Sequence, residues 1–101
     1  MKYQVVFMPE AESDLQGLYD YIANKSGEER AGAYIQRIEE ACLSLESFPE
    51  RGSLRDGLRP GLRVVGFERR ASIAFKIDGR RVVIFRILYG GRDIASELGE
   101  P

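Results

Sequence analysis

Arginine side chains in the second half of the chain are its main candidates for chemistry. Arg86 lies inside an apolar run, Arg92 follows Gly90-Gly91 at the end of that run, and Arg63 precedes another apolar run. The chain has no histidine and one cysteine. It therefore excludes a histidine-assisted nucleophile, a histidine-ligated metal and a zinc site built from several thiolates. Proton transfer would have to use Glu, Asp, Tyr, Lys or Arg, and we expect neither a metal nor a cofactor.

Charge is distributed unevenly between the two halves of the chain. Residues 1–50 carry four Lys/Arg and ten Asp/Glu, whereas residues 51–101 carry eleven Lys/Arg and six Asp/Glu. Ten of the eleven basic residues in the second half are arginines, whose planar fork suits phosphate and carboxylate. A basic half favours an anionic partner, either nucleic acid or an acidic protein, unless the acidic helices simply pair with the basic strands.

Length and composition predict one globular domain over residues 1–101. The chain is 44% hydrophobic and 31% charged, which is typical of a folded protein rather than a disordered one. No apolar run reaches the roughly 18 residues of a membrane span, and the N-terminus lacks the apolar core of a signal peptide. The single cysteine cannot form an internal disulfide, so we expect a cytoplasmic protein.

Two amphipathic helices follow a first strand at Lys2 to Met8. The first helix should run from Pro9 to Asn24, because proline suits the first helical position and an apolar stripe follows it. A capping box in Ser26-Gly27-Glu28-Glu29 predicts the start of the second helix, and Phe48-Pro49 ends it. The stripe of the first helix comprises Ala11, Leu15, Leu18 and Ile22. The two helices should form an αα-hairpin.

Three strands are expected after an irregular basic loop at Glu50 to Pro60. They are Val64 to Phe67, Ser72 to Ile77 and a last strand from Val82, with Asp78-Gly79 as the hairpin turn between the last two. The predicted fold class is therefore α+β, in the order β-α-α-β-β-β. A helical hairpin packs on one face of a small, mostly antiparallel sheet.

The register across the last hairpin decides which side chains face the helices, because a slip of one residue exchanges the two faces. A two-residue turn at Asp78-Gly79 pairs Phe75 with Val82, and a bulged turn pairs Phe75 with Val83. We favour the bulged turn, because it keeps Arg86 off the helix-packed face, where an unpaired charge would be costly.

That register leaves an apolar group on the outer face of the sheet. Exposed apolar patches of this kind usually mark the site of a partner, and a disordered segment can fold onto one by adding a strand or a helix. The predicted partner-binding residues are Ala74, Val82, Ile84 and Leu88.

Five short motifs occur along the chain in a fixed order. They are Ala11-Glu12-Ser13-Asp14-Leu15, Tyr21-Ile22, Phe48-Pro49 with Gly52, Gly61-Leu62-Arg63, and the run from Ile84 to Asp93. In this order they resemble the ParE/RelE superfamily of bacterial toxins from two-gene toxin–antitoxin modules. The final motif is similar to that family's Arg-Val-Leu-His-Gly-Ala-Arg-Asp ending, with Ile87, Tyr89 and Gly91 as departures.

The resemblance implies a toxin that is neutralised by a cognate, ParD-like antitoxin in a hetero-oligomeric complex. ParE-like members inhibit DNA gyrase by binding and need no catalytic residue of their own. The Arg-Asp ending is the ParE-like form, and the tail after Arg92 lacks the tyrosine typical of RelE-like members. We therefore lean towards a gyrase inhibitor that is not an enzyme, with Arg63, Arg86, Tyr89 and Arg92 as target contacts.

Two alternatives stay open at this point. A ribosome-dependent mRNA endonuclease of RelE type would need Tyr89, Glu68 or Lys76 for proton transfer, with arginines stabilising the charge on phosphorus. A domain that binds its antitoxin without being toxic would use the same fold. The sequence identifies neither the antitoxin nor the stoichiometry of the complex.

Overall fold

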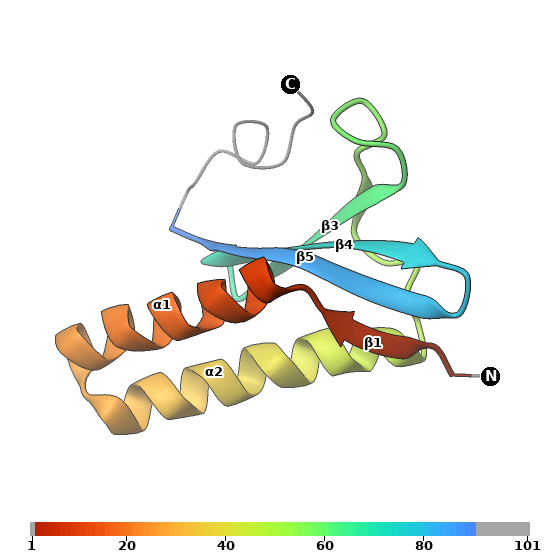
Figure 1. Cartoon of the computed structure of the whole chain (residues 1–101). Coiled ribbons are helices and arrows are strands. Elements are labelled where there is room, and N and C mark those ends of the chain that lie inside the picture. Colours follow the sequence, from red (N-terminus) through yellow and green to blue (C-terminus); the bar gives the residue numbers. More distant parts are fainter. Residues whose placement is uncertain (1, 91–101) are drawn as a thin grey trace.

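The computed structural model describes residues 2–90 and shows two helices between a first strand and a series of hairpins (Figure 1). The elements are β1 (Gln4–Phe7), α1 (Pro9–Ser26), α2 (Glu28–Leu43), a short 3-10 helix η1 (Ser44–Glu46), β2 (Ser53–Leu54), β3 (Leu62–Phe67), β4 (Ala71–Asp78) and β5 (Arg81–Tyr89).

The strands form one mixed sheet in the order β1-β5-β4-β3-β2. β1 runs parallel to β5, and the other neighbours are antiparallel. Both helices lie on one face of this sheet (Figure 1). The predicted α+β class and the packed helical hairpin are confirmed. The two-residue strand β2 is an addition, because it lies within the loop that was expected to be irregular.

The helices start and end differently from the prediction at three of four boundaries. α1 begins at Pro9 as expected, but it continues to Ser26 instead of ending at Asn24. The predicted capping box is wrong: Gly27 separates the helices at φ 95°, and no side chain caps α2. α2 ends at Leu43, before Phe48-Pro49, because the chain tightens into η1. Neither helix in the described part of the chain is long and apolar enough to cross a membrane.

The hairpin between β4 and β5 differs from both predicted registers. The turn residues are Gly79 and Arg80, one position later than expected, and Gly79 has φ 61°, as the first central residue of a type II′ turn requires. Phe75 therefore pairs with Ile84, and a bulge then leaves Phe85 unpaired before Ala74 pairs with Arg86. The favoured register is wrong because the extra residue lies inside β5 and not in the turn.

Apolar side chains form a cluster on each face of the sheet. On the helix side, Phe75, Val82 and Ile84 are fully buried against residues such as Ile38 of α2. The outer face carries a smaller cluster that contains Leu62, Val64, Ala74 and Leu88, with Leu58 and Phe85 packed against it.

Candidate functional site

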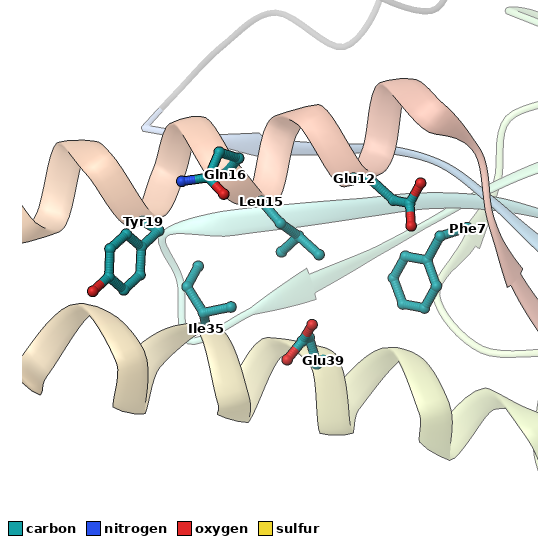
Figure 2. Close-up of a pocket in the computed structure, with 7 residues that line it drawn as sticks. All are labelled: Phe7, Glu12, Leu15, Gln16, Tyr19, Ile35 and Glu39. Atoms are coloured by element: carbon teal, nitrogen blue, oxygen red, sulfur yellow. The ribbon is translucent and has the colours of Figure 1, made fainter. Parts of the chain in front are cut away.

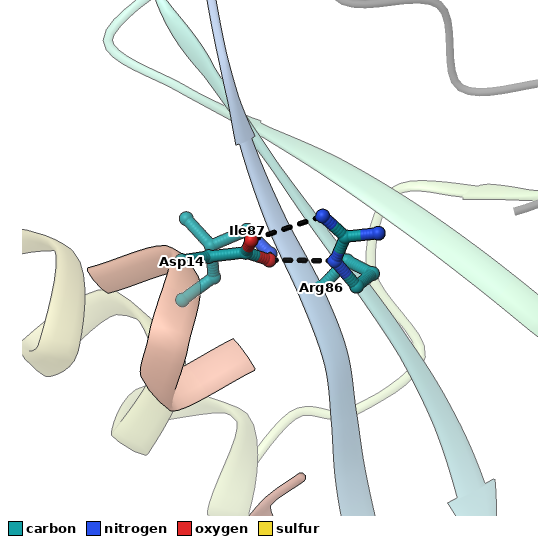
Figure 3. Close-up of polar contacts among 3 residues, drawn as sticks. All are labelled: Asp14, Arg86 and Ile87. Atoms are coloured by element: carbon teal, nitrogen blue, oxygen red, sulfur yellow. Dashed lines mark hydrogen bonds and ion pairs between the residues drawn. The ribbon is translucent and has the colours of Figure 1, made fainter. Parts of the chain in front are cut away.

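Arg86 forms an ion pair with Asp14 through two hydrogen bonds (Figure 3). Its Nε donates to Oδ2 of Asp14 at 2.7 Å, and its Nη2 donates to Oδ1 at 3.0 Å. The side chains are 21% and 11% exposed, respectively. Fork-to-fork pairs of this kind are the strong and geometrically specific form of an ion pair. Arg86 is thus paired with a carboxylate of α1.

The same carboxylate closes an open edge of the sheet. β1 pairs with β5 only as far as Ile84, and the Met8 N–H makes the last contact, to the Ile84 carbonyl. Beyond that point the chain has turned into α1. The backbone N–H of Ile87 donates instead to Oδ2 of Asp14 at 2.9 Å. A buried N–H without an acceptor would be costly. Asp14 therefore accepts the hydrogen bond that a carbonyl of a neighbouring strand would otherwise accept.

Tyr89 ends β5 inside an aromatic group between the helices and the sheet. Its ring lies edge-on to Tyr21 and Tyr34, with centroid distances of 5.9 and 6.0 Å. Tyr34 also contacts Phe67 of β3 edge-on, at 5.6 Å. Edge-to-face pairs add to the stability that the burial of ring area provides. The position of Tyr89 therefore depends on packing against both helices.

The other two predicted target contacts lie elsewhere. Arg63 is on β3, separated from β5 by β4, and its Nη1 donates to the Arg51 carbonyl at the long distance of 3.5 Å. Its neighbours Leu62 and Val64 point to the outer face, so its own side chain leaves from the helix side. Arg92 lies outside the described residues. The structure therefore does not bring Arg63 together with Arg86.

The four residues predicted to bind a partner do not form one exposed patch. Val82 and Ile84 are fully buried in the helix-side core, so their assignment to the outer face is wrong. Ala74 and Leu88 do lie on the outer face, but each is at most 2% exposed. A contact between these four residues and an antitoxin stays a prediction.

The outer face also carries a cation held on an aromatic ring. The guanidinium carbon of Arg59 lies 5.4 Å from the ring centroid of Phe85, the residue that the bulge leaves unpaired. Arg59 belongs to the long loop, which turns back on itself because Asp56 accepts a hydrogen bond from the Gly61 N–H at 2.7 Å. The loop thus places positive charge beside an apolar surface.

Neither metal chemistry nor thiol chemistry has support in the described residues. No group of three or more Cys, Asp or Glu side chains lies close enough together to hold a metal ion within residues 2–90. Burial, with a smaller contribution from Glu39, raises the pKa of the Cys42 thiol to about 12. A thiol with so high a pKa carries almost no thiolate at neutral pH and is a core residue.

A groove runs between α1 and α2 beside the end of β1 (Figure 2). Its volume is about 400 Å³, and its apolar lining comes from Phe7, Leu15, Tyr19 and Ile35. Glu12 and Glu39 face one another across it from the two helices. Such a groove suits an apolar segment that also carries basic residues.

Sequence reasoning missed the role of Asp14, although a signal for it existed. In the sequence, Asp14 was singled out only as part of the run from Ala11 to Leu15 that carries the family resemblance. Yet it lies three residues after Ala11 and four before Leu18, both of which are buried. That spacing places the carboxylate on the face of α1 that packs inwards. An acidic residue at such a position needs a buried partner, and Arg86 was the obvious candidate.

Comparisons with known proteins agree on one group. A family model described as ParE toxin of type II toxin–antitoxin system, parDE, matches residues 5–94. Toxin ParE3 of Caulobacter vibrioides is 34% identical over 87 residues, which is 86% of each chain. A structure of the chromosomal ParDE system from P. aeruginosa aligns with a TM-score of 0.78 and 28% identity, over 88% of this chain and 97% of that one.

A more distant structure shares the fold. A chain of the RelBE2 toxin–antitoxin complex from Mycobacterium tuberculosis aligns with a TM-score of 0.59 and 22% identity, over 88% of this chain and 99% of that one. At this identity the likeness concerns the arrangement of helices and strands only.

Proposed function

Since this chain belongs to the ParE toxin family of type II toxin–antitoxin systems, we propose that it arrests growth in the cytoplasm by binding DNA gyrase. We further propose that a cognate, ParD-like antitoxin neutralises it in a hetero-oligomeric complex. The arginine-rich second half of the chain supports an acidic protein or protein–DNA complex as the target.

The Asp14–Arg86 contact is the observation that favours a binding protein over a nuclease. In a nuclease, Arg86 would have to stabilise the extra charge on phosphorus in the transition state. Here Arg86 directs two donors to Asp14, and Tyr89 packs against Tyr21 and Tyr34. We assign Arg63, Tyr89 and Arg92 to target contact, and Arg86 to positioning the end of β5.

A supercoiling assay with purified gyrase tests the proposal. We expect micromolar toxin to block supercoiling or to trap cleaved DNA, and we expect premixed antitoxin to relieve the effect. Arg63→Ala should weaken inhibition, whereas Arg55→Ala, in the neighbouring loop, is the matched control. A folded protein that arrests growth but leaves gyrase unaffected at micromolar concentration would refute the target.

Two further measurements separate the alternatives. Primer extension on translated message after induction would show discrete cuts within codons if the protein were a ribosome-dependent endonuclease. Expression without the antitoxin should arrest growth. Unimpaired growth with soluble, folded toxin would favour an antitoxin-binding domain that is not toxic.

We propose the groove between α1 and α2 as a seat for the antitoxin. Its apolar floor would take one face of an amphipathic helix, and its acidic rim would take lysines or arginines of that helix (Figure 2). Glu39→Lys should weaken the complex by charge repulsion without unfolding the toxin, because Glu39 is exposed. Glu40→Lys on the same helix is the matched control, and equal affinities of the two variants would rule out this seat.

A further inference from the structure

A second pocket lies where the helices meet the β3–β4 turn and the end of β5. Its volume is about 440 Å³, within the range of about 300–1,000 Å³ that small-molecule sites occupy. Four cationic side chains line it, Lys25, Arg30, Arg37 and Arg70, against one carboxylate, that of Glu68. The pocket is thus strongly positive, although the whole chain has a net charge of −1.

Two of these four cations form no hydrogen bond, ion pair or cation–π contact in the described part of the chain. Arg37 is paired with Glu68 through its Nε, at 2.9 Å, and Lys25 lies 5.3 Å from the centroid of the Tyr21 ring. The guanidinium groups of Arg30 and Arg70, by contrast, form no hydrogen bond or ion pair within residues 2–90. Planar forks of this kind match the oxygens of a phosphate group. The pocket therefore offers donors for an anion.

Tyr34 adds a buried donor to the same pocket. The residue is 8% exposed, and its hydroxyl is buried without a hydrogen-bond partner in the described chain. Burial is the main cause that raises the pKa of Tyr34, so the phenol keeps its proton and can only gain by donating it to an acceptor. Buried hydroxyls are nearly always satisfied in native proteins, and an unsatisfied one indicates a missing partner.

The backbone of the β3–β4 turn is strained where it faces this pocket. Glu68 and Arg69 have φ angles of 48° and 61°, a region that residues other than glycine rarely adopt. Strain of this kind persists where a fixed geometry is useful, as in ligand clamps. Here the turn carries Glu68 and Arg70 to the pocket, opposite the side chains that come from α1 and α2.

An exposed aromatic ring lies beside the cations. Tyr21 is 49% exposed. Its ring contacts the ammonium group of Lys25 and, edge-on at 5.9 Å, the ring of Tyr89. One face of a base can stack on such a ring. A ring next to a phosphate-binding group is the combination that a nucleotide requires.

We propose that this pocket binds the phosphomonoester of a nucleotide. The phosphate oxygens accept hydrogen bonds from Arg30, Arg70 and the Tyr34 hydroxyl, and the base stacks on Tyr21. The Arg37–Glu68 pair can open to admit an anion, because its side chains are 50% and 42% exposed and exposed ion pairs are weak. An anion competes with Glu68 for Arg37 and reaches the Tyr34 hydroxyl as the pair opens.

Titration of the isolated protein with AMP, followed by backbone amide chemical shifts, tests the site. We expect saturable shifts around Tyr34 and Arg70 at millimolar AMP. Tyr34→Phe, which removes only the hydroxyl, and Arg70→Gln should each weaken binding about tenfold or more, the loss expected for one hydrogen bond to a charged group. Arg80→Gln, in the turn at the other end of β5, should bind AMP like the wild type.

Other ligands distinguish the parts of the proposal. Adenosine should bind far more weakly than AMP, and inorganic phosphate should shift the same amides with lower affinity. Shifts that do not saturate, or wild-type affinity in both folded variants, would overturn the proposal. So would tighter binding of a short oligonucleotide without a terminal phosphate, which would reassign the pocket to nucleic acid. None of these outcomes depends on gyrase.

Discussion

The two halves of β5 are held in different ways. Arg81 to Ile84 lies between β1 and β4, so neighbouring strands satisfy its backbone from both sides. Beyond the bulge at Phe85, the strand has β4 on one side only, and Asp14 of α1 accepts the Ile87 N–H on the other. Hydrogen bonds between backbones persist when most side chains are replaced, whereas the hydrogen bonds to Asp14 are lost when that one side chain is replaced.

The comparison separates two sources of stability within one strand. The first half depends on buried apolar volume, and the second depends on a charged group that satisfies three donors at once. Substitutions and pH should therefore affect the halves to different extents.

Ile84→Ala should have the largest effect, because Ile84 is fully buried between the sheet and the helices. We expect a loss of about 4 kcal/mol in the free energy of unfolding, from lost transfer energy and from the cavity. Urea denaturation measures it. Val83→Ala, on the less buried side of the same strand, is the control, and equal losses for the two variants would contradict the assignment of faces.

Asp14→Ala should be the next most damaging. It leaves the Ile87 N–H without its acceptor and removes the carboxylate from Arg86, so we expect a loss of about 3 kcal/mol. Ser13→Ala, exposed on the same turn of α1, should be nearly neutral. If Asp14→Ala were equally neutral in urea denaturation, the carboxylate would not hold the second half of β5.

Arg86→Lys should cost about 1–2 kcal/mol, because lysine keeps the charge but loses the second donor of the fork. A double-mutant cycle with Asp14→Ala sharpens this result. In the Asp14→Ala background, the change to lysine should lower the urea midpoint less than it does in the wild type, because the second donor of Arg86 has lost its Asp14 acceptor. Fully additive losses would mean that this donor does not stabilise the fold through Asp14.

Alkaline pH should weaken the apolar core through Cys42, which belongs to the same cluster as Val82 and Ile84. In the folded protein the pKa of the Cys42 thiol is raised to about 12, whereas in the unfolded chain it is about 8.5. The stability that the buried, protonated thiol contributes is therefore complete below about pH 8.5 and is lost as the pH rises towards 12. Between pH 8 and pH 10 the loss should be about 1–2 kcal/mol. In the variant Cys42→Ala, the free energy of unfolding should depend less on pH over this range. The same pH dependence in the variant and the wild type would contradict the prediction.

The sequence predicted the elements well, because amphipathic helices have a strong periodic signal. Ala11, Leu15 and Leu18 recur at helical spacing and are buried as expected. The order of helices and strands was predicted correctly except for β2 and the short helix η1. These features follow from local patterns that tertiary packing reinforces.

The faces of β5 could not be predicted in the same way. From Val82 to Leu88 every residue except Arg86 is apolar, so alternation gives little sign of which residues face the helices. A bulge at Phe85 then reverses the pattern halfway. The prediction of the candidate site was affected most, because the faces of the sheet on which Ile84 and Arg86 lie both depend on this one extra residue.

The pairing of β1 with β5 has a consequence for synthesis on the ribosome. Gln4 pairs with Arg81, which is synthesised much later. The first strand of the nascent chain therefore has no partner strand until most of the protein has been translated. Contacts between distant parts of a chain also form slowly. An incomplete chain therefore exposes the helix faces that the sheet later covers, and only a nearly full-length product can become a folded toxin.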